Sequence, residues 1–102
     1  MFDQQAEGGA VTESRRDVRR PPLYKVVLHN DDFTTQEFVV LILERIFHHD
    51  PGAAWHIMMH VHRRGSGIAG LFPYEIAEAK VARVHDLARA HDFPLKCSIE
   101  EE

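Results

Sequence analysis

The stretch YKVVLHNDDFTTQE, residues 24–37, decides the fold. Its first six residues are rich in β-branched and aromatic side chains, which is typical of a strand, and the following Asn30-Asp31-Asp32 is typical of a turn. Thr34 and Glu37 then have the spacing of a capping box, in which Thr34 is the N-cap and Glu37 reaches back to its amide. The stretch therefore predicts a strand, a tight turn and the beginning of a helix.

Two helices are predicted after this turn. Apolar residues recur at helical spacing from Phe38 to Phe47, and we expect the first helix to continue through His48-His49. A second helix begins at Asp50-Pro51, with Asp as the cap and Pro at the first helical position. It ends at Arg63-Arg64-Gly65, where cations occupy the last turn and glycine follows it. The apolar stripe of this second helix consists of Ala54, Ile57, Met58 and Val61.

The remainder of the chain predicts a strand, a helix and a last strand. Gly67 to Phe72 is short and apolar, Pro73 opens the helix, and Leu95 to Glu100 alternates between apolar and polar side chains. The expected inner face of this third helix is Ala77, Val81, Val84 and Ala88, supported by Ile76 and Leu87. The order β-α-α-β-α-β predicts a compact α/β sandwich, with a three-stranded antiparallel sheet and three helices packed on one face.

The first 22 residues differ in composition from the rest. Residues 1–22 contain two arginine pairs, Gly8-Gly9 and Pro21-Pro22, but few apolar side chains, so we expect a flexible N-terminal arm. Residues 23–102 form the single predicted domain. Two interpretations of the arm remain open, namely a disordered tail without a role and a tail that contributes to function.

Composition and charge exclude several classes of protein. A chain of 102 residues with 44% hydrophobic and 27% charged residues is typical of one soluble globular domain. No apolar run approaches the roughly 20 residues of a membrane span, and no export signal is evident, so we expect no membrane partner. The single cysteine, Cys97, suits a reducing cytoplasm. A net charge of -4 argues against nucleic acid as the main partner.

The eight histidines suggest metal binding or hydrolase chemistry as alternatives. His56 and His60 are four residues apart on one helical face and could chelate zinc, but no further ligands stand at a suitable spacing. His62 and Asp31 could belong to a hydrolase, but an obvious nucleophile is missing, because Cys97 faces the core. We therefore predict a binding module that is not an enzyme and needs no metal and no cofactor.

Four segments of the chain together resemble one known family. The segments are Tyr24 to Thr34, Met58 to His62, Glu75 to Val81 and Pro94 to Cys97. In this order and with these gaps they are similar to the ClpS domain, and the resemblance covers residues 23–100. Taken alone, Asn30-Asp31-Asp32 would indicate only turn chemistry and helix capping.

The resemblance implies an adaptor that binds proteins through their N-terminal residue. It implies that Asn30, Asp31 and His62 bind the α-ammonium group, for which amide, carboxylate and imidazole side chains offer acceptors. It also implies a pocket for a large apolar first side chain (Leu, Phe, Tyr or Trp), that is, for substrates called N-degrons. The implied pocket residues are Leu28, Asp32, Thr34, Gln36, Val39, Met58, Val61 and Leu95. The chain departs from the family at Thr35-Gln36, where Pro-Met is common, and this leaves the preferred first residue open.

The resemblance further implies a protein partner for delivery. Glu75 and Lys80 match positions that contact the N-terminal domain of a Clp AAA+ ATPase of the ClpA or ClpC type, and a cytoplasmic monomer is expected. Without the resemblance, both side chains would be ordinary solvated charges near the start of a helix. The alternative function left open is a small nucleic-acid-binding or ribosome-associated α/β module, based on arginines such as Arg63 and Arg64.

Overall fold

The computed structural model describes residues 20–102, which form six elements. In chain order these are β1 (Leu23–His29), α1 (Gln36–Arg45), α2 (Pro51–Arg64), β2 (Ser66–Pro73), α3 (Tyr74–Ala90) and β3 (Lys96–Glu101). The predicted order β-α-α-β-α-β is confirmed. The N-terminal arm predicted for residues 1–22 lies almost wholly outside the described residues. Only its last three residues, Arg20, Pro21 and Pro22, are described, and they are exposed.

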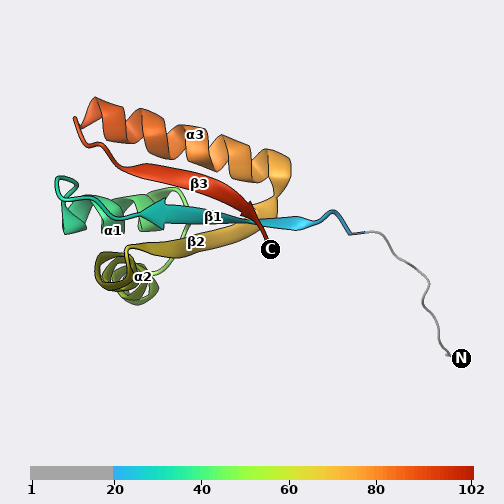
Figure 1. The fold of residues 1–102 in the computed structure, drawn as a ribbon, viewed down its shortest axis with the longest axis horizontal. Helices are drawn as coiled ribbons and strands as arrows, with labels where there is room; N and C mark the ends of the chain where they lie inside the picture. The colour runs from blue at the N-terminus through green and yellow to red at the C-terminus, as the bar shows by residue number, and fades with distance from the viewer. Residues whose placement is uncertain (1–19) are drawn as a thin grey trace, which may run out of the picture.

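The three strands form an antiparallel sheet in the order β2-β1-β3. All three helices lie on one face of it, with α3 along β3, α2 beside β2 and α1 between them (Figure 1). The side chains of Val26, Leu28, Ala69 and Cys97 point into this layer and are buried in the core. The predicted α/β sandwich is confirmed, and β1 places the turn that follows His29 at the edge between α1 and α2.

A β-bulge interrupts the pairing of β1 with β2. Val26 pairs with Gly70 and Val27 pairs with Ile68, so Ala69 is the extra residue on β2. The His49 ring nitrogen Nε2 donates to the Ala69 carbonyl oxygen at 2.6 Å. His49 thereby supplies a hydrogen-bond donor to the extra residue of the bulge.

Gly67 permits the close approach of α2 to β2. A Cβ atom at this position would lie 2.8 Å from Val61 Cγ2 and 3.1 Å from His60 Cδ2. Both distances are shorter than an ordinary carbon–carbon contact of about 3.5–4.0 Å, so only glycine fits without displacing α2. The position of Val61 therefore depends on a residue of the neighbouring strand.

Three local predictions are wrong. The N-cap of α1 is Thr35 rather than Thr34, because the Thr35 hydroxyl accepts from the Phe38 amide at 3.1 Å. The helix ends at Arg45 instead of continuing through His48-His49, since the chain turns at His48, whose φ is 62°. Ile76 was expected to support the core, but it is 48% exposed.

The predicted boundaries of α2 are confirmed, whereas α3 begins at Tyr74, one residue after the predicted Pro73, which is its N-cap. Asp50 caps α2 by accepting from the Ala53 amide at 2.8 Å, and Pro51 is its first residue. Gly65 ends α2 in the left-handed conformation at φ 93°. At the other end of the sheet, Tyr24 packs edge-to-face on Tyr74 with ring centroids 5.1 Å apart, which connects the beginning of β1 to the beginning of α3.

Candidate functional site

One backbone hydrogen bond joins the end of β1 to the end of α2. The Asn30 amide donates to the Gly65 carbonyl oxygen at 2.8 Å. Gly65 is the C-cap of α2, and His62 lies in the last turn of that helix. The bond therefore holds the Asn30-Asp31-Asp32 turn against the helix end that carries His62, although Asn30 and His62 are far apart in the sequence.

The Asp31 carboxylate holds this turn in shape. Its Oδ1 accepts from the amides of Phe33 at 2.8 Å and Thr34 at 2.7 Å, and its Oδ2 accepts from the Thr34 hydroxyl at 2.7 Å. Burial by itself raises the pKa of the Asp31 carboxyl, but the hydrogen bonds from Thr34 and Phe33 outweigh it and hold that pKa below its ordinary value. Asp31 is therefore anionic at neutral pH.

A cavity of about 200 Å³ opens between this turn, α1 and α2. The turn contributes one wall, the first turn of α1 contributes a second, and the last half of α2 contributes the third. We call this space the α1–α2 cavity. Its lining residues are Asn30, Asp31, Asp32, Thr34, Gln36, Val39, Met58, Val61 and His62. Residues from three separate segments thus meet around one small space. Each of them is among the site residues that the family resemblance implies.

The α1–α2 cavity has an apolar interior and a polar rim. Val39, Met58 and Val61 are buried members of the hydrophobic core cluster. Asn30, Asp32, Gln36 and His62 are exposed at the rim, and Asp31 is half-buried. This arrangement can accept an apolar side chain in the interior while polar acceptors at the rim bind a cationic group beside it.

Two of the predicted pocket residues do not line the α1–α2 cavity. Leu28 and Leu95 are buried in the hydrophobic core cluster instead. Both face the interior, as strand periodicity predicts. Periodicity does not indicate which part of an interior is hollow, so core and cavity residues look alike in the sequence.

The predicted docking residues lie on α3 and have different surroundings. Glu75 is exposed in the first turn of α3. Lys80 is half-buried, and its Nζ donates to the Ile46 carbonyl oxygen at 2.7 Å, so it is not an ordinary solvated charge. The Lys80 ammonium also lies 5.2 Å from the ring centroid of Phe72. Burial, and secondarily the nearby Arg83, lowers the Lys80 pKa.

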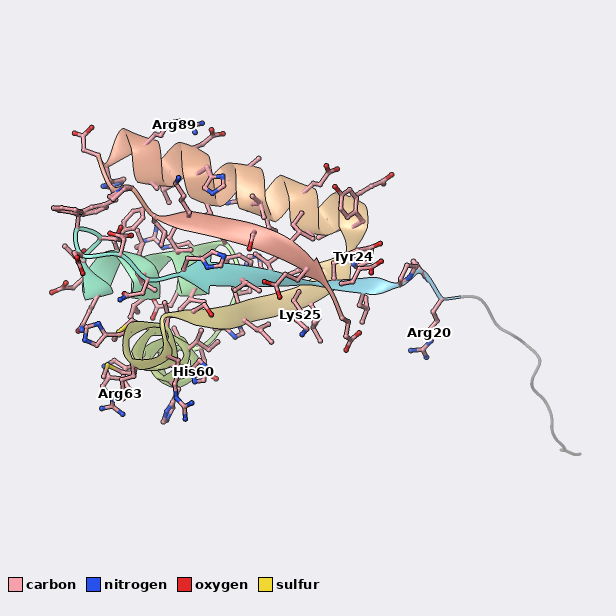
Figure 2. The ribbon with its side chains drawn as sticks, in the orientation of Figure 1. Arg20, Tyr24, Lys25, His60, Arg63 and Arg89 are labelled. Atoms are coloured by element: carbon pink, nitrogen blue, oxygen red, sulfur yellow. The ribbon has the colours of Figure 1, made fainter. Side chains whose placement is uncertain are left out.

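The histidine pair on α2 gains no further ligands. Among residues 20–102 no group of three histidine, cysteine or carboxylate side chains is placed to hold a metal ion. His60 lies beside β2, since a Cβ atom at Gly67 would be 3.1 Å from His60 Cδ2, whereas Arg63 is exposed in the last turn of α2 (Figure 2). Within the same described range, no helix is long and apolar enough to cross a membrane.

Phe33 was not recognised from the sequence as a site residue. It stands in the turn next to the α1–α2 cavity, and its side chain is 77% exposed. A large aromatic side chain at the centre of a polar turn is the signal that could have identified it, because turns favour small and polar residues.

Comparisons with known proteins identify the family of this chain. The family model described as ATP-dependent Clp protease adaptor protein ClpS matches residues 19–98. The ATP-dependent Clp protease adapter protein ClpS of Desulfatibacillum aliphaticivorans is 50% identical over 95 residues, which are 93% of this chain and 91% of that protein. The protein of the same name from Hyphomonas neptunium is 53% identical over 91 residues, covering 89% of this chain and 77% of that protein.

A solved structure is also similar. It is the structure of Agrobacterium tumefaciens ClpS2 bound to L-phenylalaninamide, which matches with a TM-score of 0.78 and 40% sequence identity. The match covers 81% of this chain and 100% of that one. The relatives are named as adaptors, which confirms the prediction of a binding module rather than an enzyme and does not favour a nucleic-acid-binding one. On the extent of the family match and the identity to these relatives, the chain belongs to the ClpS family of ATP-dependent Clp protease adaptors.

Proposed function

We propose that this protein captures other proteins by a free N-terminal residue with a large apolar side chain and delivers them to the Clp protease. The first side chain enters the α1–α2 cavity, and the α-ammonium group lies at its polar rim. The observation that carries the proposal is the meeting of an apolar interior with Asn30, Asp31 and His62 around one opening. The related ClpS2, which is bound to L-phenylalaninamide, supports it, since that compound has a free α-amino group and an aromatic side chain.

The size of the cavity suits a single side chain. Its volume of about 200 Å³ is smaller than the roughly 300–1,000 Å³ of pockets that hold drug-sized molecules. Burying one Leu or Phe side chain contributes about 1.5–3 kcal/mol, which alone gives only weak binding. The affinity must therefore also depend on the ammonium group, whose hydrogen bonds to polar acceptors contribute about 1.5–3 kcal/mol each.

Each rim residue has a distinct role toward the ammonium group. The Asn30 side chain offers its amide oxygen, and a neutral His62 offers a ring nitrogen. Asp31 already accepts three hydrogen bonds, but a carboxylate has about four acceptor positions. The fourth position, on Oδ2, remains for the ligand, and the negative charge attracts the ammonium group in addition.

Delivery requires a second surface, for which we propose the beginning of α3. Glu75 is exposed there and belongs to an element that does not line the α1–α2 cavity. The partner we propose is the N-terminal domain of a ClpA- or ClpC-type AAA+ ATPase, with the adaptor acting as a cytoplasmic monomer. Lys80 contributes to this surface mainly by fixing α3 against the end of α1, since its ammonium group is bonded to Ile46.

A panel of fluorescent peptides that differ only in the first residue tests the proposed specificity. We expect Leu, Phe, Tyr and Trp to bind, and Ile and Val to bind at least about tenfold more weakly, because a β-branched side chain collides near the backbone at the cavity mouth. Met58 lines the apolar interior, so Met58→Ala enlarges the cavity and should relax the rejection of Ile and Val. An unchanged ranking in Met58→Ala would place Met58 outside the specificity-determining wall, and equal affinity for every first residue would contradict the proposed function.

A further inference from the structure

The Asn30-Asp31-Asp32 turn has a second hollow on its other side. A groove of about 500 Å³ is lined by these three residues, which also line the α1–α2 cavity. Its remaining lining residues are His29, Phe33, Pro94 and Lys96. We call this hollow the Phe33 groove. The cavity lies between the turn and α2, whereas the groove lies between the turn and the beginning of β3. A ligand bound at the turn is therefore next to both.

Phe33 is held in a fixed position although it is exposed. Its amide donates to Asp31 Oδ1 at 2.8 Å, and the next residue, Thr34, donates to the same carboxylate by both its amide and its hydroxyl. The ring nevertheless remains 77% exposed, the largest value among the exposed large apolar side chains of the described residues. A rigid backbone that presents an uncovered aromatic ring is preorganised for contact with a ligand.

We infer that the Phe33 groove is the subsite for the second residue of the captured protein and that it favours an apolar or aromatic side chain there. This inference rests on the proposed function, which fixes the first residue at the cavity. Consecutive Cα atoms are about 3.8 Å apart, so the second residue must lie within one residue's reach of the turn. The groove begins at that turn, and Phe33 and Pro94 form its apolar wall.

The charges around the groove largely offset one another. Lys96 is opposed by the exposed Asp32 and by Asp31, whose carboxylate is already engaged by hydrogen bonds from Phe33 and Thr34. His29 is occupied by a hydrogen bond of 2.7 Å between its Nε2 and the Ser98 hydroxyl. Selection at the second position therefore depends on apolar contact with Phe33 rather than on charge.

Two peptides that begin Leu-Phe and Leu-Ser, otherwise identical, test the inference by fluorescence anisotropy. An aromatic contact of this kind corresponds to about a three- to tenfold gain in affinity, so Leu-Phe should bind more tightly than Leu-Ser by that factor. In Phe33→Ala the two peptides should bind equally, with the affinity for Leu-Ser unchanged. Trp55→Ala is the matched control, because Trp55 is also an exposed aromatic residue, at 51%, but lines neither hollow. It should retain the full preference.

The outcomes separate the subsite from the function on which it rests. If both peptides bind the unmodified protein but with equal affinity, or if Phe33→Ala retains the preference for Leu-Phe, the subsite is overturned and the proposed function stands. If neither peptide binds, both proposals are overturned. As a second measurement, the backbone amide NMR signals of Lys96 and His29 should shift more with a Leu-Phe peptide than with leucinamide; equal shifts would likewise overturn the subsite.

Discussion

Asp31 serves both the structure of the site and the proposed recognition of the ligand. It accepts hydrogen bonds from Phe33 and Thr34, and these bonds give the turn between β1 and α1 its shape. The same carboxylate places a negative charge at the rim where the ammonium group is proposed to bind. A change at Asp31 therefore alters stability and affinity together, and the dependence on pH can separate the two effects.

Replacing Asp31 with Asn tests the structural part of this role. At neutral pH we expect Asp31→Asn to lower the free energy of unfolding by about 1 kcal/mol, because hydrogen bonds to a charged acceptor become bonds to a neutral one. The folded-state pKa of Asp31 lies below its ordinary 3.8, so this contribution is present above that value and is lost as the pH falls through the folded-state pKa. Urea unfolding should show a difference between the two proteins at pH 7 that shrinks as the pH falls through the lowered pKa of Asp31.

The exposed Asp32 provides the control for this experiment. Asp32→Asn should leave the free energy of unfolding within about 0.5 kcal/mol of the unmodified protein, as is usual for surface substitutions. A stability difference for Asp31→Asn that is equally large at neutral and acidic pH would contradict an electrostatic origin.

At the scale of the elements, the sequence predicts helices and strands well and their first and last residues less well. Thr34 and Thr35 both satisfy the local pattern of an N-cap, and the choice is made by Asp31, whose carboxylate already engages the Thr34 hydroxyl. Similarly, Phe47 continues the apolar spacing of α1 beyond its end at Arg45. It is buried as the spacing predicts, but in an irregular segment that turns at His48.

The candidate site was predictable where polar residues stood in a turn and less so where side chains are apolar. Resemblance to a family brought Asn30, Asp31 and His62 together, and the structure places all three around one cavity. The resemblance could not distinguish Val61, which lines the cavity, from Leu28, which lies in the core, since both are inward-facing apolar residues. Only the packing of α1, α2 and the turn leaves a hollow at one of these positions.

Lys80 connects α3 to the end of α1, and its replacement should lower the stability of the fold. Lys80→Met retains the apolar stem but leaves the Ile46 carbonyl oxygen, at the C-cap of α1, without its ammonium donor. We expect a loss of about 1.5–3 kcal/mol in the free energy of unfolding, which is typical of a hydrogen bond to a charged group. Chemical denaturation measures this loss directly.

Glu75→Lys is the matched variant on the same helix. Because Glu75 is exposed, this change should alter stability little, yet weaken binding to the ATPase and leave peptide affinity intact. A Lys80→Met protein as stable as the unmodified one would show that the bond to Ile46 contributes nothing. Equal loss of peptide and ATPase binding in Glu75→Lys would show that the two surfaces are not independent.

At the scale of the whole molecule, capture and delivery use different parts of the chain. The α1–α2 cavity is built by the turn after β1 and by α1 and α2, whereas the proposed docking surface begins at α3. We propose that the N-terminal residues contribute to a third step, the transfer of the bound protein into the ATPase. The composition of residues 1–22 predicts a coil, for which we expect a root-mean-square span of roughly 25 Å, enough to reach beyond the domain.

Deleting residues 1–19 tests this proposal. The fold, peptide binding and ATPase docking should be unchanged, because the six elements and the lining of the α1–α2 cavity all lie within residues 20–102. Degradation of the delivered substrate should be slower. A variant in which residues 1–19 are replaced by a Gly/Ser stretch of equal length is the control, and it tests whether reach alone is sufficient. Undiminished degradation after the deletion would show that these residues have no part in delivery.

The central claim is that the α-ammonium group of a substrate is recognised at the rim of the α1–α2 cavity. The most direct test is to compare a peptide that begins with free Phe with the same peptide acetylated at its N-terminus. Acetylation removes the charge and two of the three N–H donors and leaves the aromatic contacts in place, so the charge-assisted hydrogen bonds to Asn30, Asp31 and His62 are lost. At about 1.5–3 kcal/mol for each bond, the acetylated peptide should bind at least about a hundredfold more weakly in a fluorescence titration. Binding of the two peptides within a few-fold of each other would contradict the account.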